Sequence, residues 1–357
     1  MRALSKHYTL TLVVNTGDDA LLSRHGIPAE LVRLGIERAI APLADAAALA
    51  RLGRLFVRQR FDGVVSLAPK AGLLAMAAAR FARIPFRCHV FQGEVWASAR
   101  GVRRALLKSL DRFVAALATH LLVISASERS VLEREGIVQP GQAELIANGS
   151  LCGVDLDRFR ADPQWRGDAR SELGLPRGAL VVLFLGRITR DKGVLDLAHA
   201  FRAVAGALPQ AHLVYVGPDE QGLEPALRAA VGEHSARLRI RGLTDAPERY
   251  IAAADVLALP SYREGFGNVL IEAAAAGVPG LASRIYGIED ALRDGETGLL
   301  HPPGDVGAIA AGLRRLFEDA PLREKLGRQA RERAAREFGR ENTIAFWIGF
   351  LQANTVR

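Results

Sequence analysis

The chain has 357 residues, a length that favours two domains over one. Hydrophobic residues make up 49% of it and charged residues 24%, which excludes a mainly disordered or collagen-like protein. The formal net charge is +8. Residues 1–160 hold 22 Lys and Arg against 14 Asp and Glu, whereas residues 161–357 hold 25 basic and 25 acidic residues. All of the positive excess therefore lies in the first 160 residues.

Short apolar runs in the first half of the chain predict buried strands, with helical periodicity between them. They are residues 9–15, 63–68, 86–91, 120–126 and 143–148. Residues 156–176 are polar and carry a proline near each end, which is typical of a connection between domains.

A second series of apolar runs follows this connection and again alternates with helical segments. These runs are residues 179–186, 211–217, 237–242, 255–260, 279–283 and 298–302. Such alternation predicts parallel sheets covered on both faces, and therefore two doubly wound α/β domains. After Asp305 the pattern is helical to the end, with a break at Pro321. Ligands of such sheets bind beyond the carboxyl ends of the strands, so the cleft between the domains is the expected site.

The sequence also indicates the compartment. No run approaches the ~18 consecutive apolar residues that cross a bilayer. The apolar run at 9–14 is too short for a signal peptide and is followed by Asp18 and Asp19 rather than by a cleavage site. Cys88 and Cys152 are too few for a disulfide scaffold or a Cys-rich zinc site. We therefore expect a cytoplasmic protein with reduced thiols.

The first informative segment leads from the run 179–186 into a helix. It contains Gly186, Arg187, Lys192 and Gly193, which place two cations and two permissive glycines at a strand-to-helix turn. Because a helix N-terminus favours an anion, the segment predicts a diphosphate site. It matches neither the P-loop nor the dinucleotide pattern, which disfavours those enzyme classes. A solvated loop with surface charges is the alternative for this segment alone.

The second informative segment follows the run 255–260. Glu264 precedes a GFGN loop rich in backbone amides, and Glu272 lies eight positions later in an alanine-rich helix. The two carboxylates can reach different parts of one extended ligand and accept hydrogen bonds from vicinal hydroxyls. The alternative for Glu272 is an internal salt bridge or a helix cap, since a carboxylate is rarely buried alone. Together the two segments describe a site for a pyrophosphate flanked by two sugars, which a nucleotide sugar fits.

The motifs GRxxxxKG, EGFGNVLIE, AxGxP and DGxTGLLxPPGD follow one another through the second half of the chain. Their order resembles that of the retaining glycosyltransferases of family GT4, which have the GT-B fold of two Rossmann-like domains facing across a cleft. The segments FQGEVWA, LLKSLDRF and NGSLCGVDLDRF extend the similarity over nearly the whole chain and resemble bacterial O-antigen and capsule transferases.

The resemblance implies roles for the residues of both segments. Arg187 and Lys192 would hold the donor diphosphate and stabilise its charge as the glycosidic bond breaks, and Glu264 would hold the transferred sugar. Glu272 would bind the ribose hydroxyls. Further donor-binding positions are Gly186, Gly265, Phe266, Gly267, Asn268 and Val269. The family is metal-independent, so no metal and no cofactor are expected, since two cations can offset the phosphate charge.

The resemblance also predicts the domain limits. An N-terminal acceptor-side domain is expected over residues 1–160, a nucleotide-sugar-binding domain over 161–337, and a C-terminal helix over 338–357 that packs back on the first domain. Members of the family begin with a strand, a glycine-rich turn and a helix, whereas RALSKHYTL at the start of this chain resembles the end of that helix. We therefore expect the first domain to lack its first strand-helix unit.

The acceptor side of the predicted site falls on the loop after the run 86–91. Many relatives have a histidine at the position aligned with Gln92, while here His89 lies three residues earlier and Glu94 two residues later. These three residues are the acceptor-side candidates. A hydrogen-bonded core histidine is the alternative for His89, because it lies within an apolar strand.

Asp155 and Asp157 form a DxD pattern, which is the metal signature of other glycosyltransferases. Because the pattern stands at the domain connection, a structural turn is favoured over a metal site.

The basic excess of the first half indicates an anionic partner, either a nucleic acid or a membrane surface. Residues 97–117 combine one apolar stripe with surrounding cations. The stripe is Val102, Leu106, Leu110, Phe113, Val114 and Leu117, and the cations are Arg100, Arg103, Arg104, Lys108 and Arg112. This helix would either lie on an anionic membrane or face the core with a solvated basic side. No nucleic acid is expected, since no reading-helix motif is present.

The sequence thus predicts a cytoplasmic retaining glycosyltransferase, peripheral at the inner face of the membrane. It would transfer a hexosyl or N-acetylhexosaminyl group from a nucleotide sugar, with UDP as the expected carrier, to a lipid-linked glycan in surface polysaccharide biosynthesis. The alternative is a nucleotide-sugar-binding or partner protein that has lost turnover with the first strand-helix unit.

Overall fold

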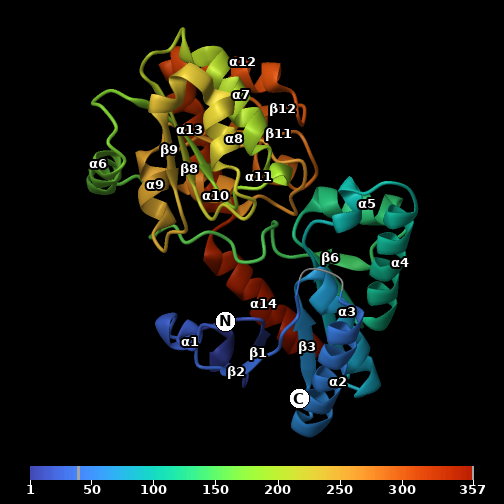
Figure 1. Cartoon of the computed structure of the whole chain (residues 1–357). Helices are drawn as coiled ribbons and strands as arrows, with labels where there is room; N and C mark the ends of the chain where they lie inside the picture. Colours follow the sequence, from blue (N-terminus) through green and yellow to red (C-terminus); the bar gives the residue numbers. More distant parts are fainter. Residues whose placement is uncertain (38–40, 356–357) are drawn as a thin grey trace. The chain divides into compact units, whose positions relative to one another are not determined.

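The computed structural model describes residues 1–37 and 41–355, which form two α/β units (Figure 1). Unit 1 comprises Met1–Ala147 and Glu341–Arg357, and unit 2 comprises Asn148–Arg340. All strand pairs of both units are parallel, so the predicted pair of Rossmann-like domains is confirmed. No described helix has both the length and the apolar character that crossing a membrane requires.

Unit 2 is built on one six-stranded sheet in the order β12-β11-β10-β7-β8-β9. The strands are β7 (Leu180–Leu185), β8 (Ala211–Val216), β9 (Leu238–Arg241), β10 (Val256–Leu259), β11 (Gly280–Ser283) and β12 (Gly298–His301). Every residue of β8, β10 and β11 is buried. This two-sided burial explains why these segments are apolar at consecutive positions instead of alternate ones.

Helices cover both faces of the unit 2 sheet. They are α6 (Pro163–Glu172), α7 (Val194–Ala205), α8 (Glu224–Val231), α9 (Pro247–Ala253), α10 (Asn268–Ala275), α11 (Ile288–Ala291), α12 (Val306–Glu318) and α13 (Ala320–Glu337), with short 3-10 turns η3 (Arg190–Lys192) and η4 (Gly232–Arg237). Helices α12 and α10 lie on opposite faces, because Leu281 of β11 contacts Gly312 of α12 while the adjacent Gly280 faces Leu270 of α10. Helix α7 packs on α12, and α13 packs on α10.

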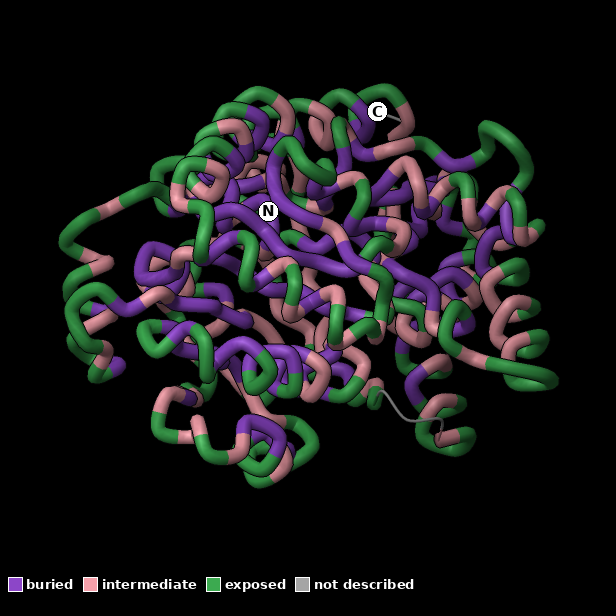
Figure 2. Tube along the Cα trace, turned by 90° about the horizontal axis from the view of Figure 1, so that it is seen from above, coloured by how far each residue is buried: buried purple, intermediate pink, exposed green. Residues whose placement is uncertain are grey.

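The strands of unit 1 form two separate sheets. Strands β3 (Gly63–Ser66), β4 (Phe86–Phe91), β5 (His120–Val123) and β6 (Ala143–Leu145) pair in that order, and β1 (Thr11–Val14) pairs with β2 (Glu30–Arg33). The helices are α1 (Leu21–Arg24), α2 (Pro42–Gln59), α3 (Pro69–Phe81), α4 (Gly101–Leu117) and α5 (Ala126–Arg134), with 3-10 turns η1 (Leu4–Lys6) and η2 (Val95–Ser98). Figure 2 shows buried runs inside the units and exposed outer turns of the helices.

Two apolar clusters form the core of unit 1. One joins Leu34 to Leu52 and Phe56 of α2 and to Ile84 before β4. The other surrounds Trp96. The last helix, α14 (Arg340–Asn354), places Phe350 against the rings of Phe86 and His120. Residues 341–355 therefore pack on the sheet of unit 1, where the C-terminal helix was expected.

The structure corrects the predicted limit between the domains, which it places after Ala147 instead of after residue 160. Residues 148–160 belong to unit 2 because they bind to the end of α13. Asn148 Nδ2 donates to Glu337 O at 3.0 Å, Val154 forms a β-bridge with Gly339, and Asp155 pairs with Arg340 at 2.8 Å. The other limit falls after Arg340 instead of after residue 337.

All eleven apolar runs coincide with strands, and Pro321 stands in the first turn of α13, directly after the end of α12. Two elements of the structure were not predicted from the sequence. Strand β2 was missed, and the polar connection at 156–176 contains helix α6, which packs on α9. Arg166 and Arg170 of α6 both pair with Asp255, which explains how so polar a helix is held.

Candidate functional site

The strand order of unit 2 fixes where its ligand site should lie. The chain proceeds from β7 to β8 and β9 on one side, then returns to place β10, β11 and β12 on the other. The order therefore reverses between β7 and β10. In open parallel sheets, ligands bind beyond the carboxyl ends of the strands at such a reversal. The loops that follow β7 and β10 are the two segments that the sequence singled out.

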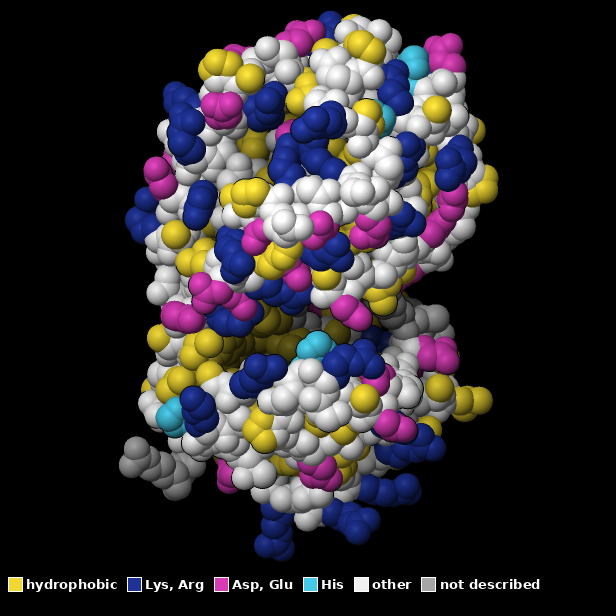
Figure 3. All heavy atoms as spheres, turned by 90° about the vertical axis from the view of Figure 1, so that its left-hand side faces the viewer, with side chains coloured by type: hydrophobic (Ala, Val, Ile, Leu, Met, Phe, Trp, Pro, Cys, Tyr) yellow, Lys and Arg dark blue, Asp and Glu magenta, His cyan; other side chains and the backbone are white. Residues whose placement is uncertain are grey.

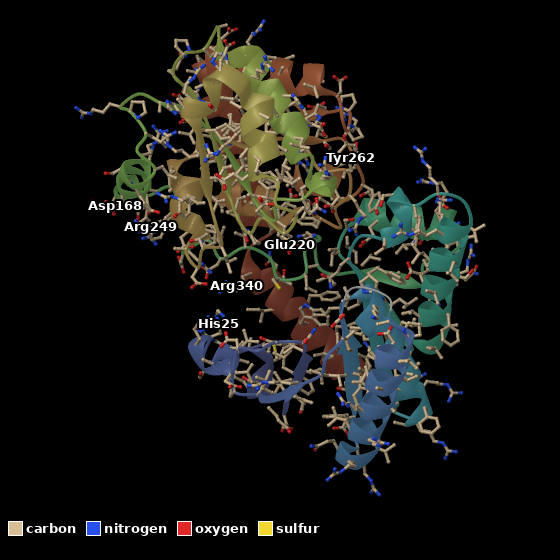
Figure 4. All side chains as sticks on the ribbon, viewed as in Figure 1. His25, Asp168, Glu220, Arg249, Tyr262 and Arg340 are labelled. Carbon is tan, nitrogen blue, oxygen red and sulfur yellow. The ribbon has the colours of Figure 1, made fainter. Side chains whose placement is uncertain are left out.

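Direct contacts join these two loops. The backbone N–H of Tyr262, labelled in Figure 4, donates to Asp191 O at 2.9 Å, and Lys192 Nζ donates to Arg263 O at 3.3 Å. Gly193 has a φ of 64°, and a Cβ there would lie 2.1 Å from Pro260 O. Only glycine allows both this conformation and this close approach. The predicted diphosphate and sugar segments are thus parts of one site.

Lys192 and Glu264 form an ion pair at the centre of this site. Nζ of Lys192 lies 2.7 Å from Oε1 of Glu264, and the two side chains are only 14% and 16% exposed. Ser261 Oγ donates to the same Oε1 at 2.8 Å. The second oxygen, Oε2, makes no hydrogen bond or ion pair within the described residues. Glu264 is therefore oriented through one oxygen and keeps the other available to a hydroxyl group of a ligand.

Arg187 lies on the same loop and pairs at 3.0 Å with Glu220, which is labelled in Figure 4. Sequence reasoning missed two further charged residues, Asp191 and Arg263. Burial alone would raise the pKa of Asp191, but a hydrogen bond from Thr189 and the charges of Lys192, Arg187 and Arg263 hold it below its usual value. Asp191 directly precedes Lys192 in the sequence, and Arg263 directly precedes Glu264. This adjacency to two predicted site residues was the signal in the sequence that could have identified them.

The start of α10 supplies backbone amides. Gly267 precedes it with a φ of 81°, and no side chain caps the helix, so its first N–H groups have no partner within the helix. Phe266 is buried and packs edge-on against Phe338 at 5.4 Å, so its side chain belongs to the core and only its amide can serve a ligand. The side chain of Asn268 is exposed. This helix start can hold an anion.

Glu272 lies one turn into α10. Its carboxyl makes no ion pair or hydrogen bond with any residue that the structure describes, so it is neither a cap nor a member of an internal salt bridge. Burial raises its pKa to about 6, which the charge of Arg158 opposes and that of Glu248 supports. A half-buried carboxyl without a partner is costly, and a ligand hydroxyl would satisfy it.

The acceptor-side candidates of unit 1 differ in their surroundings. His89 is 3% exposed, with Nδ1 2.7 Å from Ser66 Oγ, and burial lowers its pKa to about 4. It is the neutral core histidine of the alternative interpretation, and its ring does not reach the surface. Gln92 Nε2 donates to Leu67 O at 2.6 Å.

Glu94 is buried next to Glu128, a residue that the sequence did not single out. Glu128 accepts hydrogen bonds from the N–H groups of Gly93 and Ile124 at 2.5 and 3.1 Å. Burial and the charge of Glu94 raise the pKa of Glu128. This pair of carboxyls fixes the loop that follows β4. The signal in the sequence was the Ser125–Glu128 capping box.

Asp155 and Asp157 form a turn. Asp155 Oδ1 accepts hydrogen bonds from the N–H groups of Asp157 and Arg158, and its other oxygen pairs with Arg340 at 2.8 Å. Within residues 1–37 and 41–355, no three His, Cys, Asp or Glu side chains are grouped as a metal site requires.

Two family models match the chain, each over one part of it. The Glycosyl transferase 4-like domain matches residues 1–149, and Glycosyl transferases group 1 matches residues 166–333. The first match lies within unit 1 except for its last two residues, and the second contains every predicted donor residue.

Named relatives agree with the family models. The capsular polysaccharide biosynthesis glycosyltransferase CapM of Staphylococcus aureus is 27% identical over 305 residues, covering 85% of this chain and 80% of that protein. The UDP-Gal:alpha-D-GlcNAc-diphosphoundecaprenol alpha-1,3-galactosyltransferase of Escherichia coli is 28% identical over 291 residues, covering 80% and 74%. Among solved structures, Anabaena HepE in complex with UDP-glucose has the same fold, with a TM-score of 0.80 at 19% identity, covering 97% of this chain and 100% of that one.

Proposed function

This chain belongs to the GT4-like glycosyltransferases with the GT-B fold, and we propose that it transfers a hexosyl or N-acetylhexosaminyl group from a UDP-sugar to a lipid-linked glycan. The product would contribute to surface polysaccharide, with retention of anomeric configuration. The observation that carries the proposal is the junction of Arg187, Lys192 and Glu264 with the uncapped start of α10 at the strand-order reversal of unit 2.

The charges of this junction suit a nucleotide-sugar donor. As the bond from the anomeric carbon to the diphosphate breaks, negative charge grows on the leaving nucleoside diphosphate. Arg187, Lys192 and the first amides of α10 would stabilise that charge. The open oxygen of Glu264 would accept a sugar hydroxyl, and the unpaired carboxyl of Glu272 would accept the ribose hydroxyls. In this arrangement the cations replace a divalent metal.

Calorimetry with UDP tests the donor half of the proposal. We expect UDP to bind equally well in the presence and absence of EDTA, because the positive charge comes from side chains. Lys192→Ala should weaken binding under both conditions. Loss of affinity on chelation would contradict metal independence. Release of nucleoside diphosphate from a panel of donors would then identify the sugar.

The printed names of two relatives support the acceptor. One serves capsular polysaccharide biosynthesis, and the other acts on a diphosphoundecaprenol-linked sugar. A lipid-linked acceptor would bring the protein to a membrane, and helix α4 offers a surface for it. Its predicted apolar stripe is divided in the structure, because Val114 is buried while Val102, Leu106 and Phe113 are 86%, 56% and 51% exposed.

The cations of α4 are divided as well. Arg104 and Lys108 each lie 2.8 Å from Glu135, and Arg112 donates to Gly136 O at 2.7 Å. Arg100 and Arg103 are exposed and make no side-chain contact of this kind with any described residue. An exposed apolar surface bordered by free cations suits an anionic membrane, which we propose as the partner of unit 1. The comparisons give no support to the alternative of a binding protein without turnover.

A further inference from the structure

Ser150 has an unusual backbone for a residue with a side chain. Its φ is 70°, in the left-handed region that glycine adopts without steric cost, and it is fully buried. Residues in such conformations persist where the surrounding structure requires them, and they gather at functional sites. Glycine would suit this backbone conformation better than serine, but it has no hydroxyl group. The hydroxyl group is therefore the feature that could explain why a serine stands here.

That hydroxyl is fully engaged. Ser150 Oγ accepts hydrogen bonds from the N–H groups of Gly153 at 3.1 Å and Cys152 at 3.4 Å, which occupy both of its lone pairs. Its single hydrogen must then be donated, and the acceptor is Oδ1 of Asn268 at 2.7 Å. This requirement fixes the orientation of the Asn268 carboxamide, because the opposite orientation would bring two donors together.

With Oδ1 of Asn268 turned toward Ser150, the amide nitrogen Nδ2 points away from Ser150. Nδ2 of Asn268 makes no hydrogen bond with any residue that the structure describes, and the side chain is exposed at the first residue of α10. The same helix start carries the uncapped amides, and Glu264 lies four residues earlier. Two N–H bonds are thus presented where the proposed function places an oxygen-rich diphosphate sugar.

We infer that Ser150 is a positioning residue, which holds Asn268 so that its Nδ2 donates to an oxygen of the bound nucleotide sugar. The inference rests on the proposed donor site of unit 2. The backbone strain at Ser150 is retained because glycine, which would relieve it, cannot fix the amide.

The first test separates the hydroxyl from the backbone. Ser150→Gly relieves the backbone strain but removes the hydroxyl and its three hydrogen bonds, so the two effects on thermal stability oppose each other. The KM for the donor should rise about three- to ten-fold, the value of one hydrogen bond. The kcat should change little. Ala147→Gly is the matched control, because Ala147 has a φ of 46° and carries no hydroxyl. That variant should keep the parental KM.

A double-mutant cycle with Asn268→Ala tests the route of the effect. If Ser150 acts through Asn268, then Ser150→Gly should raise the donor KM in the parent and leave it unchanged in the Asn268→Ala background. Asn268→Asp should behave like Asn268→Ala, because a carboxylate still accepts from Ser150 but cannot donate.

The outcomes distinguish this inference from the proposed function. If the parent binds UDP and Ser150→Gly has the parental donor KM, the positioning role is wrong and the donor site stands. Equal effects of Ser150→Gly in both backgrounds would also overturn it, since Ser150 would then act independently of Asn268. If the parent binds no nucleotide or nucleotide sugar, the donor site and this inference both fail.

Discussion

The two units of this chain share one fold type and differ in how they use their surface. Unit 2 has a continuous six-stranded sheet, and its polar side chains meet in one connected site where the strand order reverses. Unit 1 has its strands in two sheets, and all four residues of β1 are only partly buried. The same architecture thus gathers polar and charged side chains at one point of unit 2 and leaves the strands of unit 1 divided between two sheets.

The surface of unit 1 is both apolar and basic. Of the twelve large hydrophobic side chains that are exposed among the described residues, nine lie in unit 1, which is why we propose the membrane as a partner of that unit. Exposed arginines of α2 and α3 and of the turns after them make no ion pair with any described residue. They are Arg51, Arg54, Arg58, Arg60, Arg80 and Arg83. In Figure 3, Lys and Arg side chains project from the lower end of unit 1.

The largest effect should follow from removing the cations of unit 2. Lys192→Ala and Arg187→Ala should each reduce turnover at least ten-fold, because a charge-assisted contact is worth roughly 1.5 to 3 kcal/mol. Together they should reduce it about a hundred-fold or more if they act independently. Arg190→Ala is the matched control, since Arg190 is exposed on the same loop. Near-parental turnover of either single variant would show that its side chain does not hold the diphosphate.

Unit 2 could be predicted from the sequence because its determinants are local. The apolar runs give its buried strands, and the loops after β7 and β10 carry glycines and charges whose spacing indicates chemistry. What the sequence could not give is the pairing of those charges. Glu264 was assigned to the sugar and Lys192 to the diphosphate, yet they lie 2.7 Å apart. A contact between residues 72 positions apart depends on the register of two strands.

Unit 1 was harder to predict for physical reasons. Strand β2 reads ELVR, with charged residues at both ends and only two apolar ones, so it gives no periodic signal. The sequence shows the apolar residues that form one face of α4. Whether those residues are buried depends on which neighbouring elements cover that face. Helix α3 and Trp96 lie against one part of the helix, and Val102 and Leu106 are left exposed. Coverage of this kind is a tertiary property.

The second prediction concerns this exposed surface. Val102→Glu combined with Leu106→Glu should release the protein from vesicles that contain anionic lipid, because each apolar side chain that enters the bilayer contributes about 1.5 kcal/mol or more. Added salt should release the parent as well. Co-sedimentation measures both effects, and UDP affinity should stay at the parental value.

Leu43→Glu provides the control for this experiment. Leu43 is 89% exposed on α2 of the same unit, so the variant introduces the same kind of charge away from α4. It should still co-sediment. If the α4 variant also stays bound to vesicles, the exposed stripe is not the membrane contact.

A third, smaller effect should separate the two carboxylates of unit 2. Glu272→Gln should weaken binding of UDP and of the intact donor by the same factor, about three- to ten-fold, because both ligands contain the ribose. Glu264→Gln should weaken only the intact donor. It releases Lys192 from its ion pair, so UDP affinity should be unchanged or higher. Calorimetry with the two ligands gives the ratio. Equal losses for both ligands on Glu264→Gln would contradict the sugar contact.

The smallest expected effect is on stability, and it comes from the same Glu272. Its pKa is about 6 in the folded protein against 4.5 for an ordinary glutamate, so the folded state binds the proton more tightly than the unfolded state. Below about pH 4.5 both states are protonated and the group costs nothing. As the pH rises through 6, its ionisation lowers the free energy of unfolding by up to about 2 kcal/mol. Glu272→Gln should therefore be as stable as the parent at pH 4.5 and more stable at pH 8 in urea unfolding. The control Glu332→Gln, at an exposed position of α13, should show no such pH dependence.

Saturating UDP should stabilise the parent more than the variant, because the carboxylate then gains the ribose hydroxyls. If UDP raised the free energy of unfolding equally in both proteins, the carboxyl group of Glu272 would not contact the nucleotide.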